Sequence, residues 1–234
     1  MKHLFNSFLL TFIVTIITGV MILFFVNVDN NIIDVRADEF SPAEKRAANK
    51  DDILDIFQLI KLRDKKLITG ISINPMTKDI IVENYPVNLK SSYNHKSLGD
   101  LYEYGGIKLL VKTINKDYNK KYNRYLLIKN ENDLIKLLDV VGSLEIEGKL
   151  YDNIKNNTKI NSQIIDSENF LELLNNRDEK ITMGIIKEAF KQKISILDTQ
   201  MGEETFKKMI NIVDSDISYK DFNNLTQVRL DEWY

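Results

Sequence analysis

The chain has 234 residues, of which 44% are hydrophobic and 28% charged, and its formal net charge at pH 7 is −2. Because both charge signs are mixed in a nearly neutral chain, there is no broad electrostatic attraction for nucleic acid, and we expect no nucleic-acid partner. The chain has no cysteine and two histidines, His3 and His95. This composition excludes a disulfide framework, a thiolate metal site and a histidine-rich zinc site.

An uncharged segment near the start of the chain, Phe8–Val26, predicts a transmembrane anchor. Its sequence, FLLTFIVTIITGVMILFFV, is long enough as a helix to cross the hydrocarbon core of a bilayer. The alternative is a cleaved signal peptide, whose apolar region is usually shorter and is followed by a cleavage site of small residues. Asn27 and Asp29 follow here instead, which favours an uncleaved, single-pass anchor.

The anchor sets the expected organisation of the chain. Residues 1–7 form a short tail before it, and residues 27–52 form a juxtamembrane linker. Ser41–Glu44 has the spacing of a capping box with proline at the first helical position, which predicts a short helix from Pro42 within the linker. The remainder is large enough for one domain with its own core.

Two β-branched segments predict a hairpin after the linker. Leu67–Asn74 and Ile80–Val82 flank a turn at Pro75–Asp79, as the strands of a β-hairpin do. The preceding segment is ambiguous, because Ile53–Ile60 has helical spacing whereas Phe57–Leu62 also suits a strand.

Beyond the hairpin, the apolar periodicity changes repeatedly between helix and strand. Gly106–Asn119 predicts a helix and Tyr125–Ile128 a short strand, and Asn130–Val141 predicts an amphipathic helix that Gly142 closes. Leu144–Glu147 alternates like an edge strand. The remaining predictions are an exposed loop at Lys149–Gln163 and helices at Ser167–Asn176, Thr182–Leu197 and Glu203–Ile212. Strands alternating with helices predict an α/β sandwich.

A small basic cluster, hereafter the basic turn, precedes the predicted hairpin: Lys61, Arg63, Lys65 and Lys66. One interpretation is a solvated turn. The other is a contact with lipid phosphates near the bilayer, where each basic residue contributes about 1 kcal/mol. The cluster is too short and too mixed with apolar residues to indicate a nucleic-acid-binding segment.

Several short segments follow one another in an order that is typical of a known family. They are Ile73–Lys78 (INPMTK), Tyr85–Pro86 (YP), Tyr102–Gly106 (YEYGG), Tyr125–Ile128 (YLLI), Leu138–Gly142 (LDVVG) and Ile212–Phe222 (IVDSDISYKDF). Their order and approximate spacing resemble the LytR-CpsA-Psr family. The resemblance covers roughly residues 53–228 and leaves residues 229–234 as a C-terminal tail.

The resemblance implies an α/β/α sandwich with a central mixed sheet, outside the cytoplasmic membrane of a walled bacterium, with the N-terminus inside. Members of the family transfer a glycopolymer from a polyprenyl pyrophosphate carrier to peptidoglycan, with a magnesium ion. Such chemistry requires arginines for the pyrophosphate, carboxylates for the metal and an apolar groove for the prenyl chain. Five apolar residues are interpreted as core rather than as groove: Leu110, Val111, Leu134, Leu137 and Ile186.

The chain departs from the family at its charged positions. Val87 and Asn88 stand where the family has an arginine and an aspartate, and Asn175 stands where it has the first of two arginines. Lys66 or a neighbouring residue replaces an acid that the family places before the first hairpin strand. Because each lost charge-assisted bond weakens binding by about 1.5–3 kcal/mol, no catalytic residue is assigned, and magnesium is expected only if the family site survives.

A few charged residues remain as candidates for contact with a ligand. Arg177, which keeps the second arginine of the family, is proposed with Lys180 and Lys96 as a ligand-binding group. An arginine at a helix end also has a purely structural interpretation. If the chain is active, Asp100, Glu103 and Lys96 are the nearest replacement groups.

Three functions are consistent with these observations. The favoured hypothesis is a membrane-anchored, catalytically degenerate relative that binds a polyprenyl-linked glycopolymer precursor, peptidoglycan or an active paralogue of the family. The alternative is an active phosphotransferase that attaches a glycopolymer to peptidoglycan. The third is an unrelated anchored component of division or sporulation. A cytoplasmic transcription regulator is disfavoured, since we identify no basic recognition helix.

Overall fold

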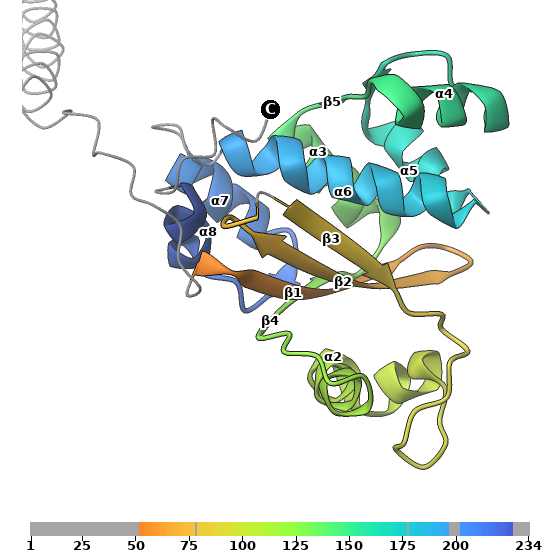
Figure 1. The fold of residues 1–234 in the computed structure, drawn as a ribbon, viewed down its shortest axis with the longest axis vertical. Helices are drawn as coiled ribbons and strands as arrows, with labels where there is room; N and C mark the ends of the chain where they lie inside the picture. Colours follow the sequence, from red (N-terminus) through yellow and green to blue (C-terminus); the bar gives the residue numbers. More distant parts are fainter. Residues whose placement is uncertain (1–51, 78, 177, 197–201, 227–234) are drawn as a thin grey trace, which may run out of the picture. The chain divides into compact units, whose positions relative to one another are not determined.

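The structure is a computed structural model that describes residues 52–77, 79–176, 178–196 and 202–226. Within these ranges a five-stranded mixed sheet has the strand order β3-β2-β1-β4-β7 (Figure 1). No helix in the described ranges has the length and apolar character needed to cross a membrane. The predicted anchor Phe8–Val26, the helix from Pro42 and the tail 229–234 lie outside the described residues.

The first three strands form an antiparallel meander. They are β1 (Leu54–Lys61), β2 (Lys66–Asn74) and β3 (Asp79–Asn84), with Phe57 of β1 opposite Gly70 of β2. The predicted hairpin is confirmed as β2 and β3. The ambiguous segment before it is a strand, because its apolar residues are buried on both faces of a central strand and therefore lack a clear alternation.

Two further strands complete the sheet. Strand β4 (Arg124–Ile128) runs parallel to β1, and the short strand β7 (Asp214–Ser215) pairs antiparallel with β4. Because β1 and β4 are parallel neighbours, the connection between the meander and β4 must cross one face of the sheet, and it does so through a helix.

Seven helices and a small second sheet account for most of the remaining chain in the described ranges. The helices are α2 (Leu98–Asp117), α3 (Glu131–Val141), α4 (Gly148–Asn157), α5 (Ser167–Asn175), α6 (Glu179–Ile196), α7 (Gly202–Ile210) and α8 (Tyr219–Thr226). Strands β5 (Leu144–Glu145) and β6 (Ile164–Ile165) pair antiparallel as the small sheet. The edge strand predicted at Leu144–Glu147 is therefore confirmed over its first two residues.

Helices cover both faces of the central sheet. Along β1, Ile56 and Ile60 belong to a core shared with α3, α5 and α6, whereas Phe57 and Leu59 belong to a second core shared with α2. This alternation follows from the two-residue side-chain period of a strand. Figure 1 shows α2 on one side of the sheet and the other large helices on the opposite side. The predicted α/β sandwich with a central mixed sheet is confirmed.

Helix α2 contains a sharp break that positions the site described below. It begins at the N-cap Ser97, whose hydroxyl accepts a hydrogen bond from the backbone N–H of Asp100. At Gly106 the backbone has φ 70° and ψ −171°, a conformation accessible almost only to glycine. The predicted helix Gly106–Asn119 is thus confirmed from Ile107 to Asp117. The helical piece of residues 98–105 that precedes it was not predicted.

The predicted exposed loop at Lys149–Gln163 is wrong over most of its length, because residues 148–157 form helix α4. Ile154 is fully buried, and Leu150 and Tyr151 pack partly against the same core. These apolar residues have helical spacing, but the lysines and asparagines around them obscured the pattern.

Candidate functional site

A basic cleft lies beside the turn between β1 and β2. Its volume is about 900 Å³. The lining residues come from the basic turn, the loop after β3 and the start of α2: Lys61, Leu62, Arg63, Asp64, Lys65, Lys66, Val87, Asn88, Lys90, Ser97, Gly99 and Asp100. The cleft thus brings the basic turn together with Val87 and Asn88, the positions that the family resemblance marked. Its lining contains five basic residues and two acids.

The basic turn is held in place by contacts with α2. The Lys61 and Lys66 ammonium groups lie 5.5 Å and 5.9 Å from the centre of the Tyr102 ring. Lys66 also forms an ion pair of 2.8 Å with Glu103. Glu103, a candidate replacement acid, is therefore neutralised by a lysine of the cleft, and hydrogen bonding to Lys66 lowers the pKa of its carboxyl group. The backbone N–H of Arg63 donates to Glu131 at the start of α3.

Lys65 connects the cleft to the segment that the family resemblance assigned to paired arginines. Its ammonium group donates a 3.2 Å hydrogen bond to the backbone carbonyl of Asn176, and burial lowers the pKa of the amine. The Asn175 side chain instead bonds to the Leu171 carbonyl within α5. Arg177 lies outside the described residues, so its role as a ligand-binding group stays a prediction.

Asp100 supports the local backbone of the cleft. The Ser97 hydroxyl donates to its carboxylate at 2.5 Å and accepts from its backbone N–H at 3.1 Å. The hydrogen bond from Ser97 lowers the pKa of Asp100, which keeps this exposed carboxyl ionised. A carboxylate that is held ionised at a helix N-terminus is suited to capping and poorly suited to donating a proton.

The other two candidates lie outside the cleft lining. Lys96 places its ammonium group 5.0 Å from the centre of the Tyr104 ring. Lys180 is exposed in the first turn of α6, where its backbone N–H donates to Asp178. His95 is exposed in the loop after β3. The residues that the sequence did not mark as candidates are Lys90, which lines the cleft, and Tyr102, which faces two of its lysines.

The cleft residues do not fit a magnesium site. Its two acids are Asp64 and Asp100, and they stand among five basic side chains that favour an anion over a divalent cation. Asn88, which the family resemblance aligns with an aspartate, supplies no charge. Within the described part of the chain, no group of three or more His, Asp or Glu side chains could hold a metal ion.

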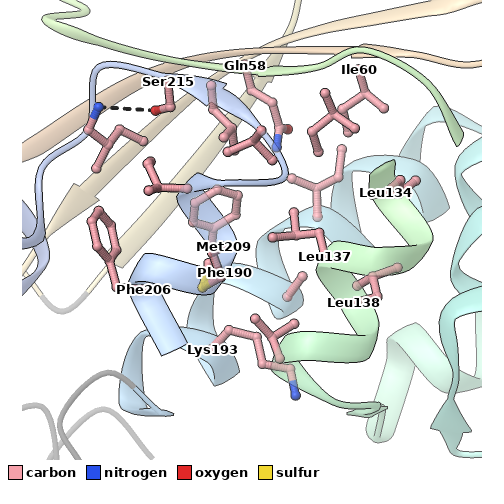
Figure 2. A pocket seen from close by; sticks show the side chains of 18 of the residues that line it. Gln58, Ile60, Leu134, Leu137, Leu138, Phe190, Lys193, Phe206, Met209 and Ser215 are labelled. Carbon is pink, nitrogen blue, oxygen red and sulfur yellow. Dashed lines mark hydrogen bonds between the residues drawn. The ribbon is translucent and has the colours of Figure 1, made fainter. Parts of the chain in front are cut away.

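A second, apolar cavity of about 120 Å³ lies within the core on the face of the sheet opposite α2. Figure 2 shows the side chains that line it. Residues of α3, α6, α7 and the strands line it, including Leu134, Leu137 and Ile186. Leu134 and Ile186 are buried members of the core and Leu137 packs against it, as predicted, and all three also line the cavity. Leu110 is fully buried in the α2 core, and Val111 packs against that core, as predicted.

The apolar cavity has a charged group at one end. Lys193 of α6 lines the cavity and donates a 2.6 Å hydrogen bond from its ammonium group to the Ser143 carbonyl. Burial lowers the pKa of this amine. Figure 2 shows Gln58 and Ser215 at the other end of the cavity, with apolar side chains between. The Gln58 side-chain oxygen accepts a 3.0 Å hydrogen bond from the Thr69 hydroxyl.

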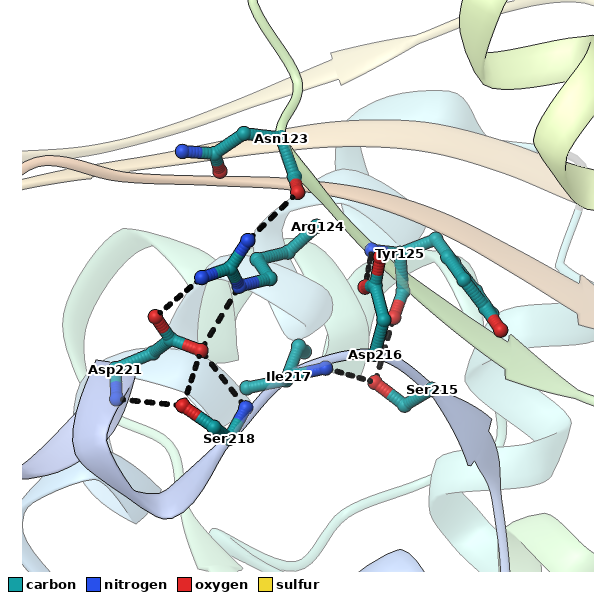
Figure 3. Close-up of polar contacts among 8 residues, drawn as sticks. All are labelled: Asn123, Arg124, Tyr125, Ser215, Asp216, Ile217, Ser218 and Asp221. Carbon is teal, nitrogen blue, oxygen red and sulfur yellow. Dashed lines mark hydrogen bonds and ion pairs between the residues drawn. The ribbon is translucent and has the colours of Figure 1, made fainter.

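Strand β7 and helix α8 form one wall of the apolar cavity, and polar contacts bind this wall to β4 (Figure 3). Arg124 of β4 donates two hydrogen bonds, of 2.8 Å and 2.9 Å, to the carboxylate of Asp221. The Tyr125 backbone N–H donates to Asp216 at 2.6 Å. These contacts hold Ile217 and Phe222 against the cavity.

The α/β sandwich, with helices on both faces of the sheet, is similar to several solved structures. A protein from Enterococcus faecalis described as a transcriptional regulator has a TM-score of 0.59 and 14% identity, covering 80% of this chain and 76% of that one. Bacillus subtilis TagV has a TM-score of 0.55 and 12% identity, covering 76% and 79%. TagT, solved with LI-WTA bound, has a TM-score of 0.55 and 15% identity, covering 80% and 81%.

TagV and TagT are LytR-CpsA-Psr proteins. The chain has the LytR-CpsA-Psr fold. The resemblance drawn from short segments is thereby confirmed at the level of the fold. Searches of the sequence against family models and against curated proteins give no match. The LytR-CpsA-Psr fold is thus retained in a chain whose sequence is divergent, and its basic cleft carries lysines beside Val87 and Asn88.

Proposed function

We propose that this protein is a membrane-anchored binding protein of the bacterial cell envelope. It engages a polyprenyl-linked glycopolymer precursor outside the cytoplasmic membrane and does not transfer it. The observation that carries this proposal is the basic cleft, in which lysines surround the positions where the family has an arginine and an aspartate. The cleft retains positive charge for an anionic head group and lacks a carboxylate cluster for a metal.

Lysine gives the cleft a different selectivity from arginine. An ammonium group is a compact point charge that binds phosphate without the paired, planar hydrogen bonds of a guanidinium. Lys61 and Lys66 are held near Tyr102, so their charges are positioned before a ligand arrives. We therefore expect the pyrophosphate to be bound as an anion and left intact.

The apolar cavity suits part of a prenyl chain. A cavity of about 150 Å³ lined by apolar side chains holds a ligand the size of benzene, so a space of this order accommodates only a short stretch of hydrocarbon. The anchor Phe8–Val26 would keep the protein beside the bilayer in which such a carrier resides.

The solved structures with the same fold support the proposed binding of a glycopolymer precursor. TagT has been solved with LI-WTA and with LIIa-WTA, which are wall teichoic acid intermediates. Peptidoglycan and an active paralogue of the family remain further partners under the same proposal, since a non-catalytic binder near the wall would encounter both. The role involves no metal-dependent step, because the donor set of the cleft does not fit magnesium.

The test is binding of a C55 polyprenyl pyrophosphate to the full chain in detergent micelles. The double variant Lys61→Ala/Lys66→Ala should weaken binding at least tenfold, since charge-assisted hydrogen bonds contribute about 1.5–3 kcal/mol each. Lys149→Ala/Lys155→Ala, which removes two exposed lysines of α4, is the matched control and should leave affinity unchanged. Equal affinities for both double variants, or no binding by the parent protein, would contradict the proposal.

A further inference from the structure

Two exposed tyrosines form an aromatic pair close to the basic cleft. Tyr104 is 61% exposed and Tyr93 37% exposed, and their ring centres lie 6.0 Å apart with an interplanar angle of 43°. Both belong to segments that flank cleft residues, since Lys90 and Ser97 enclose the loop of Tyr93 and Asp100 precedes Tyr104 on α2. Large aromatic side chains usually bury their rings, so two neighbouring exposed rings require an explanation.

The loop that carries Tyr93 is fixed by hydrogen bonds. The Ser91 hydroxyl donates to the Lys96 carbonyl at 2.9 Å, and the Lys96 backbone N–H donates to the Tyr93 carbonyl at 3.1 Å. Ser92 bonds to Asp117 of α2 through both its backbone N–H and its hydroxyl. A tyrosine on such a loop is presented to solvent with little conformational entropy left to lose on binding.

The break in α2 fixes the second ring. Because Gly106 turns the backbone, the helical piece of residues 98–105 does not continue the axis of the rest of α2. Figure 1 shows these two pieces side by side at different angles. The Lys96 ammonium group lies 5.0 Å from the centre of the Tyr104 ring and supplies hydrogen-bond donors next to the aromatic face.

The size and surroundings of the pair indicate the kind of ligand. A stable protein–protein interface needs about 800 Å² on each partner, with a broad apolar centre. Here two rings are surrounded by polar residues, among them Asn94, His95 and Lys96. A pyranose ring matches this chemistry, because its C–H groups pack on an aromatic face while its hydroxyls accept and donate hydrogen bonds at the rim.

We propose that Tyr93, Tyr104 and Lys96 form a saccharide-binding platform beside the basic cleft. Tyr104 stacks on one sugar ring, Tyr93 contacts the same or the adjoining ring, and Lys96 donates to a sugar hydroxyl or carbonyl. This inference rests on the proposed function in one respect: a precursor whose pyrophosphate occupies the cleft would carry its sugars toward this platform. A glycan strand of peptidoglycan would offer the same sugar chemistry.

The test is binding of an N-acetylglucosamine tetramer, free of lipid and phosphate, to the full chain in detergent micelles. Tyr104→Ala should weaken binding about tenfold, which corresponds to about 1.4 kcal/mol. Tyr104→Trp should restore it, since a larger ring keeps the stacking face. Ile164→Ala is the matched control, because Ile164 is 60% exposed on β6 and is not part of the platform or the cleft.

The outcomes separate the platform from the proposed function. Binding of the tetramer that depends on Tyr104 supports the platform, whether or not polyprenyl pyrophosphate binds. Binding of polyprenyl pyrophosphate without any binding of the tetramer, or tetramer binding that Tyr104→Ala and Ile164→Ala affect equally, overturns the platform and leaves the proposed function standing. Parallel titrations with peptidoglycan glycan strands and with a polyprenyl-linked saccharide distinguish the two sources of sugar.

Discussion

At the scale of single residues, the ion pair between Arg124 and Asp221 has a defined structural role. It joins α8 to β4 and closes one wall of the apolar cavity. Burial raises the pKa of Asp221, but hydrogen bonds from Arg124 and Ser218 lower it more, so that the folded-state pKa lies below the usual value. The hydrogen bonds that Arg124 donates to Asp221 raise the pKa of the Arg124 guanidinium.

This pair predicts how stability depends on pH. A carboxyl group whose folded-state pKa is lowered stabilises the fold above its unfolded pKa of about 3.9, and this stabilisation is lost as the pH falls through the folded-state value. Asp221→Asn should therefore lower the free energy of unfolding at pH 7 by about 2 kcal/mol. The difference between variant and parent should shrink as the pH falls below about 4.

Urea denaturation at several pH values measures this effect. The matched control is Lys207→Ala, which breaks an exposed pair with Glu203 on α7 and should change stability by less than about 0.5 kcal/mol. A loss in Asp221→Asn that is as small as in the control, or that does not depend on pH, would show that the pair does not hold α8 in place.

At the scale of elements, local patterns in the sequence predicted most of the secondary structure. Helix α3 was recognised because apolar residues repeat on one face and Gly142 follows its last turn; the structure adds that Asn130 caps its start and that Gly142 has φ 78°. Strand β1 stayed ambiguous because its neighbours, rather than its own residues, determine that it is central and buried. Helix α4 was missed because Ile154 is its one fully buried residue, and the lysines and asparagines around it obscured the helical spacing.

The dependence of α4 on one residue is testable. Ile154→Ala should lower the free energy of unfolding by about 2–5 kcal/mol, as large-to-small core substitutions do. It should also increase amide hydrogen exchange in residues 148–157 before other regions. Exchange that rises equally across the sheet would mean that α4 does not unfold as a separate unit.

The basic cleft could be predicted only in part. The family resemblance drew attention to Val87 and Asn88 as positions without charge, and the basic turn was noted as a cluster. Their convergence with Lys90 depends on how the loop after β3 folds back beside the turn between β1 and β2, which no local pattern encodes. The apolar cavity was not predicted, because side chains that line a cavity have the same spacing as side chains that fill a core.

At the scale of the whole molecule, the account requires the domain to lie outside the cytoplasmic membrane. The absence of cysteine from the chain makes this simple to test, because one introduced thiol is the only one present. Asn156→Cys on the exposed face of α4 should react with a membrane-impermeant thiol reagent in whole cells. Protection until the cells are lysed would reverse the topology. The unsubstituted protein should not react.

The central claim is that the cleft binds a lipid-linked pyrophosphate as an anion and without metal-dependent chemistry. Its most direct test is the affinity of the full chain for C55 polyprenyl pyrophosphate, titrated with magnesium and with a chelator. We predict affinities that agree within about twofold and no release of phosphate or of prenyl alcohol. Binding that requires magnesium, accompanied by turnover of the carrier, would contradict the account and indicate an active transferase.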